Sequence, residues 1–127
     1  MTAFYWVMIG GALGAALRFG MGRLLPFQGQ HFPWATFWVN GIGCLMIGLL
    51  IGYLEKKSIR VDVIRWLWIS GFCGGFTTFS AFSLETITLF QNDRGAVAII
   101  YALTSVGAGL LLTWIGWWMM RPGSITF

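Results

Sequence analysis

The chain has 127 residues, of which 57% are hydrophobic and only 9% are charged. Soluble domains carry about 25% charged residues, so this composition excludes an ordinary soluble domain and predicts an integral membrane protein. The formal net charge of +4 comes from eight basic and four acidic residues. Because the basic residues mostly flank the apolar stretches and form no clustered patch, this charge does not indicate nucleic-acid binding.

Four apolar stretches are long enough to cross a bilayer core, which takes about 20 helical residues. In chain order they are Phe4–Met21, Trp34–Leu54, Trp66–Phe90 and Gly95–Met120. Short connections join them, at Gly22–Pro33, Glu55–Arg65 and Gln91–Arg94. We therefore expect an all-α membrane protein with one four-helix transmembrane domain over residues 1–127 and both termini on the same side.

The first stretch is interpreted as a retained span, because no basic segment precedes it and no clear cleavage site follows it. Arg18 near its end is expected to reach the interface, to pair with a carboxylate or to attract anions. Small residues recur at helix-packing spacing, as in Gly10 with Gly14 and Gly48 with Gly52. General bundle packing is the favoured interpretation of these pairs. Four thin helices can hardly enclose a pathway alone, so we expect an oligomer.

In the second span, Asn40 is a side-chain amide at membrane depth. It has two interpretations: an interhelical hydrogen bond, or a donor that faces a conduit and replaces water around an anion. The two cysteines, Cys44 and Cys73, both fall within predicted spans. They are interpreted as small apolar residues, and two cysteines with one histidine make no zinc site.

The third span contains a polar break, Gly74-Gly75-Phe76-Thr77-Thr78. Glycine and threonine weaken a helix, and such a break is tolerated in a membrane when it is buried in protein or lines a cavity or ion site. A helix that stops near Gly74 presents free carbonyl oxygens, and one that restarts near Thr77 or Thr78 presents free N–H groups. Converging carbonyls suit a dehydrated monovalent cation such as Na⁺.

Beyond the break, Phe79 and Phe82 share a helix face with Ser80 beside them. These rings are either packing groups or ring edges that contact an anion, because the edge of an aromatic ring is positive. Glu85 is the one acid within a span and is a candidate functional group by default. In the fourth span the hydroxyls of Tyr101, Ser105 and Thr113 fall roughly on one face, with Gly109 between them.

The basic residues are nearly balanced between the two sides of the predicted bundle. Five fall on the side of the termini and three on the other side: Lys56, Lys57, Arg60, Arg65 and Arg121, against Arg18, Arg23 and Arg94. Cytoplasmic loops normally carry an excess of Lys and Arg. This weak bias permits insertion in both orientations without proving it.

The run Gly74-Gly75-Phe76-Thr77-Thr78-Phe79-Ser80-Ala81-Phe82-Ser83-x-Glu85 resembles the signature of the fluoride channel family known as Fluc or CrcB. The resemblance covers essentially the whole chain. It extends to Gly10-Gly11 with Gly14 and Arg18, to Thr36 and Val39-Asn40, and to Tyr101, Ser105 and Thr113. Two residues depart from the family pattern: Ala81 stands where the motif usually has Thr or Ser, and Gly109 stands where some members have a Ser.

The resemblance implies an antiparallel, dual-topology homodimer with two fluoride pathways in the plasma (inner) membrane of a bacterium. It implies a central structural Na⁺ held by backbone oxygens at Gly74 and Thr77, and vestibule positions for Arg18 and Glu85. The implied pathway residues are Asn40, Phe79, Ser80, Phe82, Tyr101, Ser105 and Thr113. Pairing with a second, related gene product stays open.

The sequence is therefore interpreted as a passive fluoride-specific channel that lowers cytoplasmic fluoride, with lipid and fluoride as partners and no catalysis. The alternative is a proton-coupled small multidrug-type exporter, but that class uses a glutamate in its first helix, where this chain has no acid. A third hypothesis is a non-transporting assembly subunit. An enzyme is disfavoured because one loop histidine, His31, cannot complete a nucleophile–base–acid set.

Overall fold

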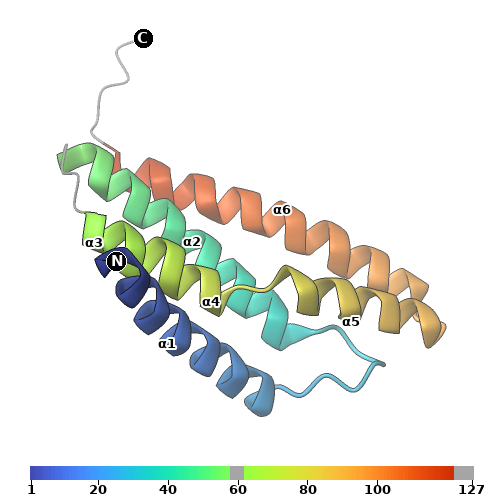
Figure 1. Ribbon diagram of the computed structural model, residues 1–127. Coiled ribbons are helices and arrows are strands. Elements are labelled where there is room, and N and C mark those ends of the chain that lie inside the picture. Colours follow the sequence, from blue (N-terminus) through green and yellow to red (C-terminus); the bar gives the residue numbers. More distant parts are fainter. Residues whose placement is uncertain (58–61, 122–127) are drawn as a thin grey trace, which may run out of the picture.

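The computed structural model describes residues 1–57 and 62–121 as a helical bundle in which successive spans run in opposite directions (Figure 1). The elements are α1 (Thr2–Leu24), α2 (Trp34–Lys57), α3 (Asp62–Ile64), η1 (Arg65–Cys73), α4 (Gly74–Phe76), α5 (Phe79–Gln91) and α6 (Gly95–Met120). The short elements α3 to α5 follow one another and together form the third rod of the bundle. Arg60, one of the basic residues counted above, lies outside the described residues.

Four helical segments are long and apolar enough to cross a membrane: Thr2–Leu24, Trp34–Lys57, Asp62–Gln91 and Gly95–Met120. This confirms the four predicted spans. Three of them are longer than predicted by a few residues, because the helices continue into polar residues such as Arg23 and Lys57 that hydropathy leaves out. In the described part of the chain every regular element is helical.

The bundle consists of two closely packed helix pairs, and glycines make both possible. In the first pair, α1 packs along η1 and α4, and a Cβ on Gly10 or Gly14 would collide with the backbone of Leu67 or Phe72. In the second pair, α2 packs along α6, and a Cβ on Gly48 would collide with the backbone of Thr113. The predicted small-residue pairs thus bring helix backbones of one chain together.

The segment η1 is wound as a π-helix, which hydropathy and small-residue spacing did not predict. At its end the amide of Gly74 donates to the carbonyl of Ile69, five residues earlier. Gly71 in this segment lies against α1, where an added Cβ would be 2.9 Å from the carbonyl oxygen of Val7. π-helical turns are rare and often adjoin functional sites. Here the π-helix leads directly into α4 and the residues that follow it.

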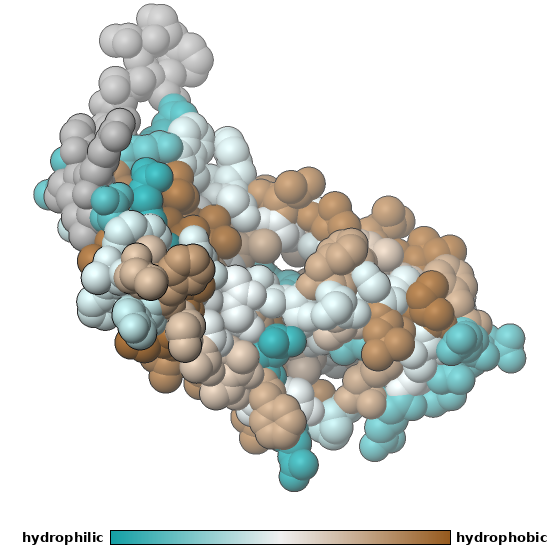
Figure 2. All heavy atoms as spheres, in the orientation of Figure 1, coloured by the Kyte–Doolittle hydropathy of each residue, from teal (hydrophilic) through white to brown (hydrophobic). Residues whose placement is uncertain are grey.

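The outer surface is mostly apolar, as expected for helices in contact with lipid or with another chain. Figure 2 shows hydrophilic residues gathered toward the ends of the molecule and hydrophobic ones along its sides. The same view shows a hollow near the centre with a hydrophilic group inside it. Large apolar side chains are exposed along every long helix, including Phe4, Trp38, Leu84 and Leu110.

Candidate functional site

The third rod is interrupted at Thr77 and Thr78, both of which have extended backbone. Helix α4 ends where the backbone of Thr77 becomes extended; its amide still makes the helical bond to the carbonyl of Cys73 at 2.9 Å, and its hydroxyl donates to the same carbonyl at 2.8 Å. Helix α5 begins because the Thr78 hydroxyl accepts a hydrogen bond from the amide of Ala81 at 3.1 Å, as a helix-capping threonine does. The predicted stop near Gly74 comes two residues early, since α4 continues to Phe76.

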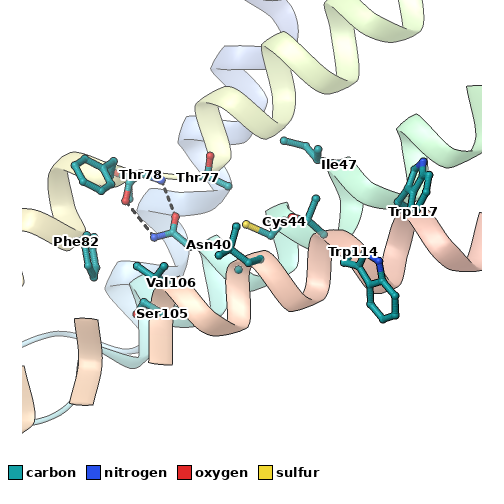
Figure 3. A pocket seen from close by; sticks show the side chains of 14 residues that line it. Asn40, Cys44, Ile47, Thr77, Thr78, Phe82, Ser105, Val106, Trp114 and Trp117 are labelled. Atoms are coloured by element: carbon teal, nitrogen blue, oxygen red, sulfur yellow. Dashed lines mark hydrogen bonds between the residues drawn. The ribbon is translucent and has the colours of Figure 1, made fainter. Parts of the chain in front are cut away.

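Asn40 on α2 hydrogen-bonds both the amide and the carbonyl of the extended residue Thr78. Its Oδ1 accepts the amide of Thr78 at 2.7 Å, and its Nδ2 donates to the carbonyl of Thr78 at 3.1 Å (Figure 3). The carboxamide therefore replaces the two hydrogen bonds that Thr78 would make in a helix. The structure thus assigns Asn40 the interhelical hydrogen bond. It leaves the second N–H of the same amide group available, because Nδ2 carries two hydrogens.

A groove of about 640 Å³ runs beside the interruption, between α5, α2 and α6. Its wall is mainly apolar, with few polar groups, and Figure 3 shows Asn40, Cys44 and Ser105 along it. The lining residues are Asn40, Cys44, Ile47, Thr77, Thr78, Phe79, Phe82, Ser105, Val106, Gly109, Leu110, Thr113, Trp114 and Trp117. A few fixed polar groups in an apolar wall are typical of a binding site or conduit for a small solute.

Five of the seven residues expected along a pathway line this one groove: Asn40, Phe79, Phe82, Ser105 and Thr113. The hydroxyl of Ser105 is buried and has no hydrogen-bond partner among the described residues. An unpaired buried hydroxyl costs free energy, so it is a donor ready for a ligand or water. Gly109 also lines the groove, where an added Cβ would lie 3.4 Å from the sulfur of Cys44.

Ser80 and Tyr101 do not line the groove. Ser80 is exposed, and its hydroxyl lies 3.2 Å from that of Thr78. Tyr101 is fully buried in a cluster with Leu89 and Ala98. Its hydroxyl donates to Oε2 of Glu85 at 2.7 Å, while Thr36 donates to Oε1 at 2.7 Å. Tyr101 therefore holds Glu85 in place from α6.

Glu85 lines a second, smaller cavity of about 510 Å³. The connection between α1 and α2 and the end of α5 form its wall, with Phe27, Gly29, Leu84, Thr88 and Asn92 among the lining residues. Asn92 donates to the carbonyl of Gly29 at 2.9 Å and so ties the two segments together. Glu85 and Asn40 thus lie in different cavities, on either side of the start of α5.

Arg18 occupies a position that the sequence did not predict. It was expected to reach the interface, to pair with a carboxylate or to attract anions. In the structure its Nε donates to the carbonyl oxygen of Gly75 on α4 at 3.1 Å. This bond joins two residues 57 positions apart, and the side chain is half-buried. Arg18 therefore lies at the depth of the interruption.

Sequence reasoning gave no role to several residues in or beside the two cavities. Thr36 lies one helical turn before Asn40 on the same face of α2. This spacing indicated a second polar contact from that face, which Thr36 makes with Glu85. Cys44, Trp114 and Trp117 line the groove but read as ordinary apolar residues of their helices. No local pattern distinguishes them, because only the packing of α2 against α6 brings them to the groove.

The two backbone oxygens expected to hold a cation, those of Gly74 and Thr77, lack their usual helical donors. The amide of Thr78, four residues after Gly74, donates to Asn40. The amide of Ala81, four residues after Thr77, donates to the Thr78 hydroxyl. No cluster of three His, Cys, Asp or Glu side chains occurs in the described part of the chain. The donor set therefore consists of neutral carbonyl oxygens, which fit a hard monovalent cation.

Four apolar helices, an interrupted third rod and an apolar groove with a few polar groups together define a small multi-pass membrane protein with a transport-type site. Residues 5–117 match the family described as "CrcB-like protein, Camphor Resistance (CrcB)". The chain belongs to this family.

Similar proteins from three bacteria carry the name "Fluoride-specific ion channel FluC". The protein of Flavobacterium psychrophilum is 42% identical, covering 91% of this chain and 94% of its own. That of Novosphingobium aromaticivorans is 44% identical, covering 95% and 98%. That of Helicobacter acinonychis is 40% identical, covering 93% and 94%. These names describe channels, a class without catalysis, and not proton-coupled exporters.

Proposed function

We propose that this chain is a fluoride-selective channel that lets fluoride leave the cell passively across the bacterial inner membrane. The observation that carries the proposal is the groove in which Asn40, Phe79, Phe82, Ser105 and Thr113 meet. The names of the relatives support fluoride as the ion. Fluoride holds its water strongly, so a selective route must supply hydrogen-bond donors in a narrow space.

The donors of the groove suit a small anion. The Ser105 hydroxyl has no partner in the described chain, and the Asn40 amide has a second N–H. The rings of Phe79 and Phe82 lie 5.5 Å apart between centroids, tilted by 43°. Ring edges carry partial positive charge and contact an anion without binding it tightly. An ion can then pass from donor to donor without being trapped.

A second copy inserted in the opposite orientation would complete the pathway. Phe79 is 77% exposed in the single chain although it lines the groove, so another surface must cover it to make a narrow conduit. Glycine contacts within the chain already use the small-residue faces of α1 and α2, so those faces are not free to bind a second copy. The proposed dimer therefore joins through the face that carries the interruption.

A structural Na⁺ at the interface between the two copies is part of this proposal. The carbonyl oxygens of Gly74 and Thr77 would hold it, because both have lost their helical donors. When bound, the cation supplies positive charge in the middle of the membrane. The residues that line the groove then need no formal charge of their own to make the region favourable for an anion.

Efflux from proteoliposomes tests the function directly. Vesicles loaded with fluoride or with chloride, and containing the purified chain, are treated with a potassium ionophore so that charge can balance. Ion-selective electrodes should record fluoride release with chloride retained over the same interval, and protein-free vesicles should release neither. Release of both anions at equal rates, or of neither, contradicts the proposal.

Gly74→Ala tests the proposed interface. Within the single chain, a Cβ on Gly74 or on Gly20 would meet no heavy atom within 4 Å. Alanine in a helix is more stable than glycine by about 1 kcal/mol, so an isolated chain should tolerate both changes. In the dimer only Gly74→Ala should lower the unfolding temperature and shift the protein toward monomer in size-exclusion chromatography. Equal behaviour of the two variants would place the interface elsewhere.

A further inference from the structure

Arg18 takes one of the backbone oxygens released where α4 ends. The last four carbonyls of a helix have no helical donors, and at the end of α4 they belong to Gly74, Gly75, Phe76 and Thr77. Thr77 satisfies Cys73 with two hydrogen bonds. Arg18 satisfies Gly75 at 3.1 Å. The carbonyl oxygens of Gly74 and Thr77 have no helical amide donor.

The packing of α1 holds the Arg18 charge in this position. Arg18 lies one helical turn after Gly14, and a Cβ on Gly14 would lie 2.7 Å from the amide nitrogen of Phe76. On the facing helix, a Cβ on Gly75 would lie 2.9 Å from the Cα of Gly11. The backbones of α1 and α4 are therefore in direct contact. The guanidinium is a fixed part of the site, and Arg keeps its charge at every physiological pH.

We propose that Arg18 is a positioning and specificity residue of the cation site, restricting it to monovalent cations. It removes the Gly75 oxygen from the set of possible ligands, and it places a permanent positive charge at the carbonyl of the residue that follows Gly74. This inference rests on the proposed function, since it assumes that these oxygens hold a cation. It assigns to Arg18 a role that the anion pathway does not require.

The physical reason is that repulsion scales with the product of the two charges. A fixed guanidinium therefore opposes Ca²⁺ twice as strongly as it opposes Na⁺ in the same place. Backbone carbonyls are ordinary ligands of Ca²⁺, so the remaining oxygens alone give no protection against it. With Arg18 present, the more weakly charged ion is favoured, and the site stays compatible with a nearby anion.

The experiment measures the unfolding temperature of the full-length protein in detergent while NaCl or CaCl₂ replaces N-methylglucamine chloride. A cation that binds the folded protein raises this temperature as its concentration passes the dissociation constant. Arg18→Gln keeps a donor for Gly75 and removes the charge. We expect its half-maximal Na⁺ concentration to fall about tenfold and its half-maximal Ca²⁺ concentration about a hundredfold.

Two matched variants separate charge from tethering. Arg18→Lys keeps the charge and should retain the wild-type preference for Na⁺ even if it unfolds at a lower temperature. Arg23→Gln removes an exposed charge from the last turn of the same helix and should leave both titrations unchanged. If Arg18→Gln lowers the unfolding temperature equally at every concentration of both ions, Arg18 is only a tether and the proposal is overturned.

Absence of the cation site gives a different result. Wild-type unfolding that depends on neither ion, together with fluoride efflux, would remove the cation and with it the role of Arg18, while the channel would stand. If Arg18→Gln does not fold, the wild-type protein still decides. Stabilisation by Ca²⁺ at lower concentrations than by Na⁺ overturns the proposal, and the opposite order supports it.

Discussion

Asn40→Asp should abolish fluoride efflux and loosen the interruption of the third rod. The aspartate can still accept the amide of Thr78, as Asn40 does at 2.7 Å. Its second oxygen would then face the carbonyl oxygen of Thr78, to which Asn40 now donates at 3.1 Å. Losing that bond and leaving two acceptors together costs about 1–3 kcal/mol. The negative charge would also repel an anion from the groove.

The efflux of fluoride from proteoliposomes and the unfolding temperature in detergent are measured together for this variant. Asn40→Leu is the matched variant: it removes both hydrogen bonds without adding charge. It should lower the unfolding temperature at least as much as Asn40→Asp, whereas the aspartate should have the larger effect on efflux per folded protein. Wild-type efflux through a folded Asn40→Asp protein would show that the groove is not the route.

Phe79→Ile and Phe82→Ile should each reduce fluoride efflux by about tenfold or more while the protein stays folded. Both rings line the groove, and isoleucine offers an anion no positive ring edge. Each tenfold loss of rate corresponds to about 1.4 kcal/mol of lost stabilisation, the order of one aromatic contact. Because Phe79 is 77% exposed within its own chain, its replacement should change the stability of the single chain little. Phe82 also packs 5.2 Å from the ring of Tyr101 and should cost more stability.

Phe90→Ile is the control for these variants. Phe90 lies near the end of the same helix, is 49% exposed and is not part of the groove lining. Its efflux should match that of the wild type. Unchanged efflux in both Phe79→Ile and Phe82→Ile would make these rings packing groups and remove them from the pathway.

Properties that follow from local composition could be predicted from the sequence. The spans were predicted because each helix must satisfy its own backbone in lipid, so an apolar stretch of sufficient length has few other structures available. The glycine pairs Gly10–Gly14 and Gly48–Gly52 indicated close helix contacts, and the structure confirms that they pack within one chain. Phe79 and Phe82 share a face, as their spacing predicted.

The contacts of the polar residues could not be predicted, because they depend on how distant helices are aligned. Asn40 had two possible interpretations until the structure brought it to the backbone of Thr78, 38 residues away. Tyr101 was expected with Ser105 and Thr113, yet it turns to Glu85 because α5 packs on that side of α6. The π-helix of η1 also has no signal in hydropathy, since the mean hydropathy of a segment does not depend on which carbonyl each amide bonds to.

By itself, the sequence determined that this protein crosses the membrane four times and that its third crossing carries a run of residues unfavourable to a continuous helix. Both follow from the hydrogen bonding and hydropathy of neighbouring residues. Only the tertiary structure decided which side chains meet the interruption: Asn40 on one side and Arg18 on the other. Those contacts join residues 38 and 57 positions apart, and their register is set by the glycine contacts between helices.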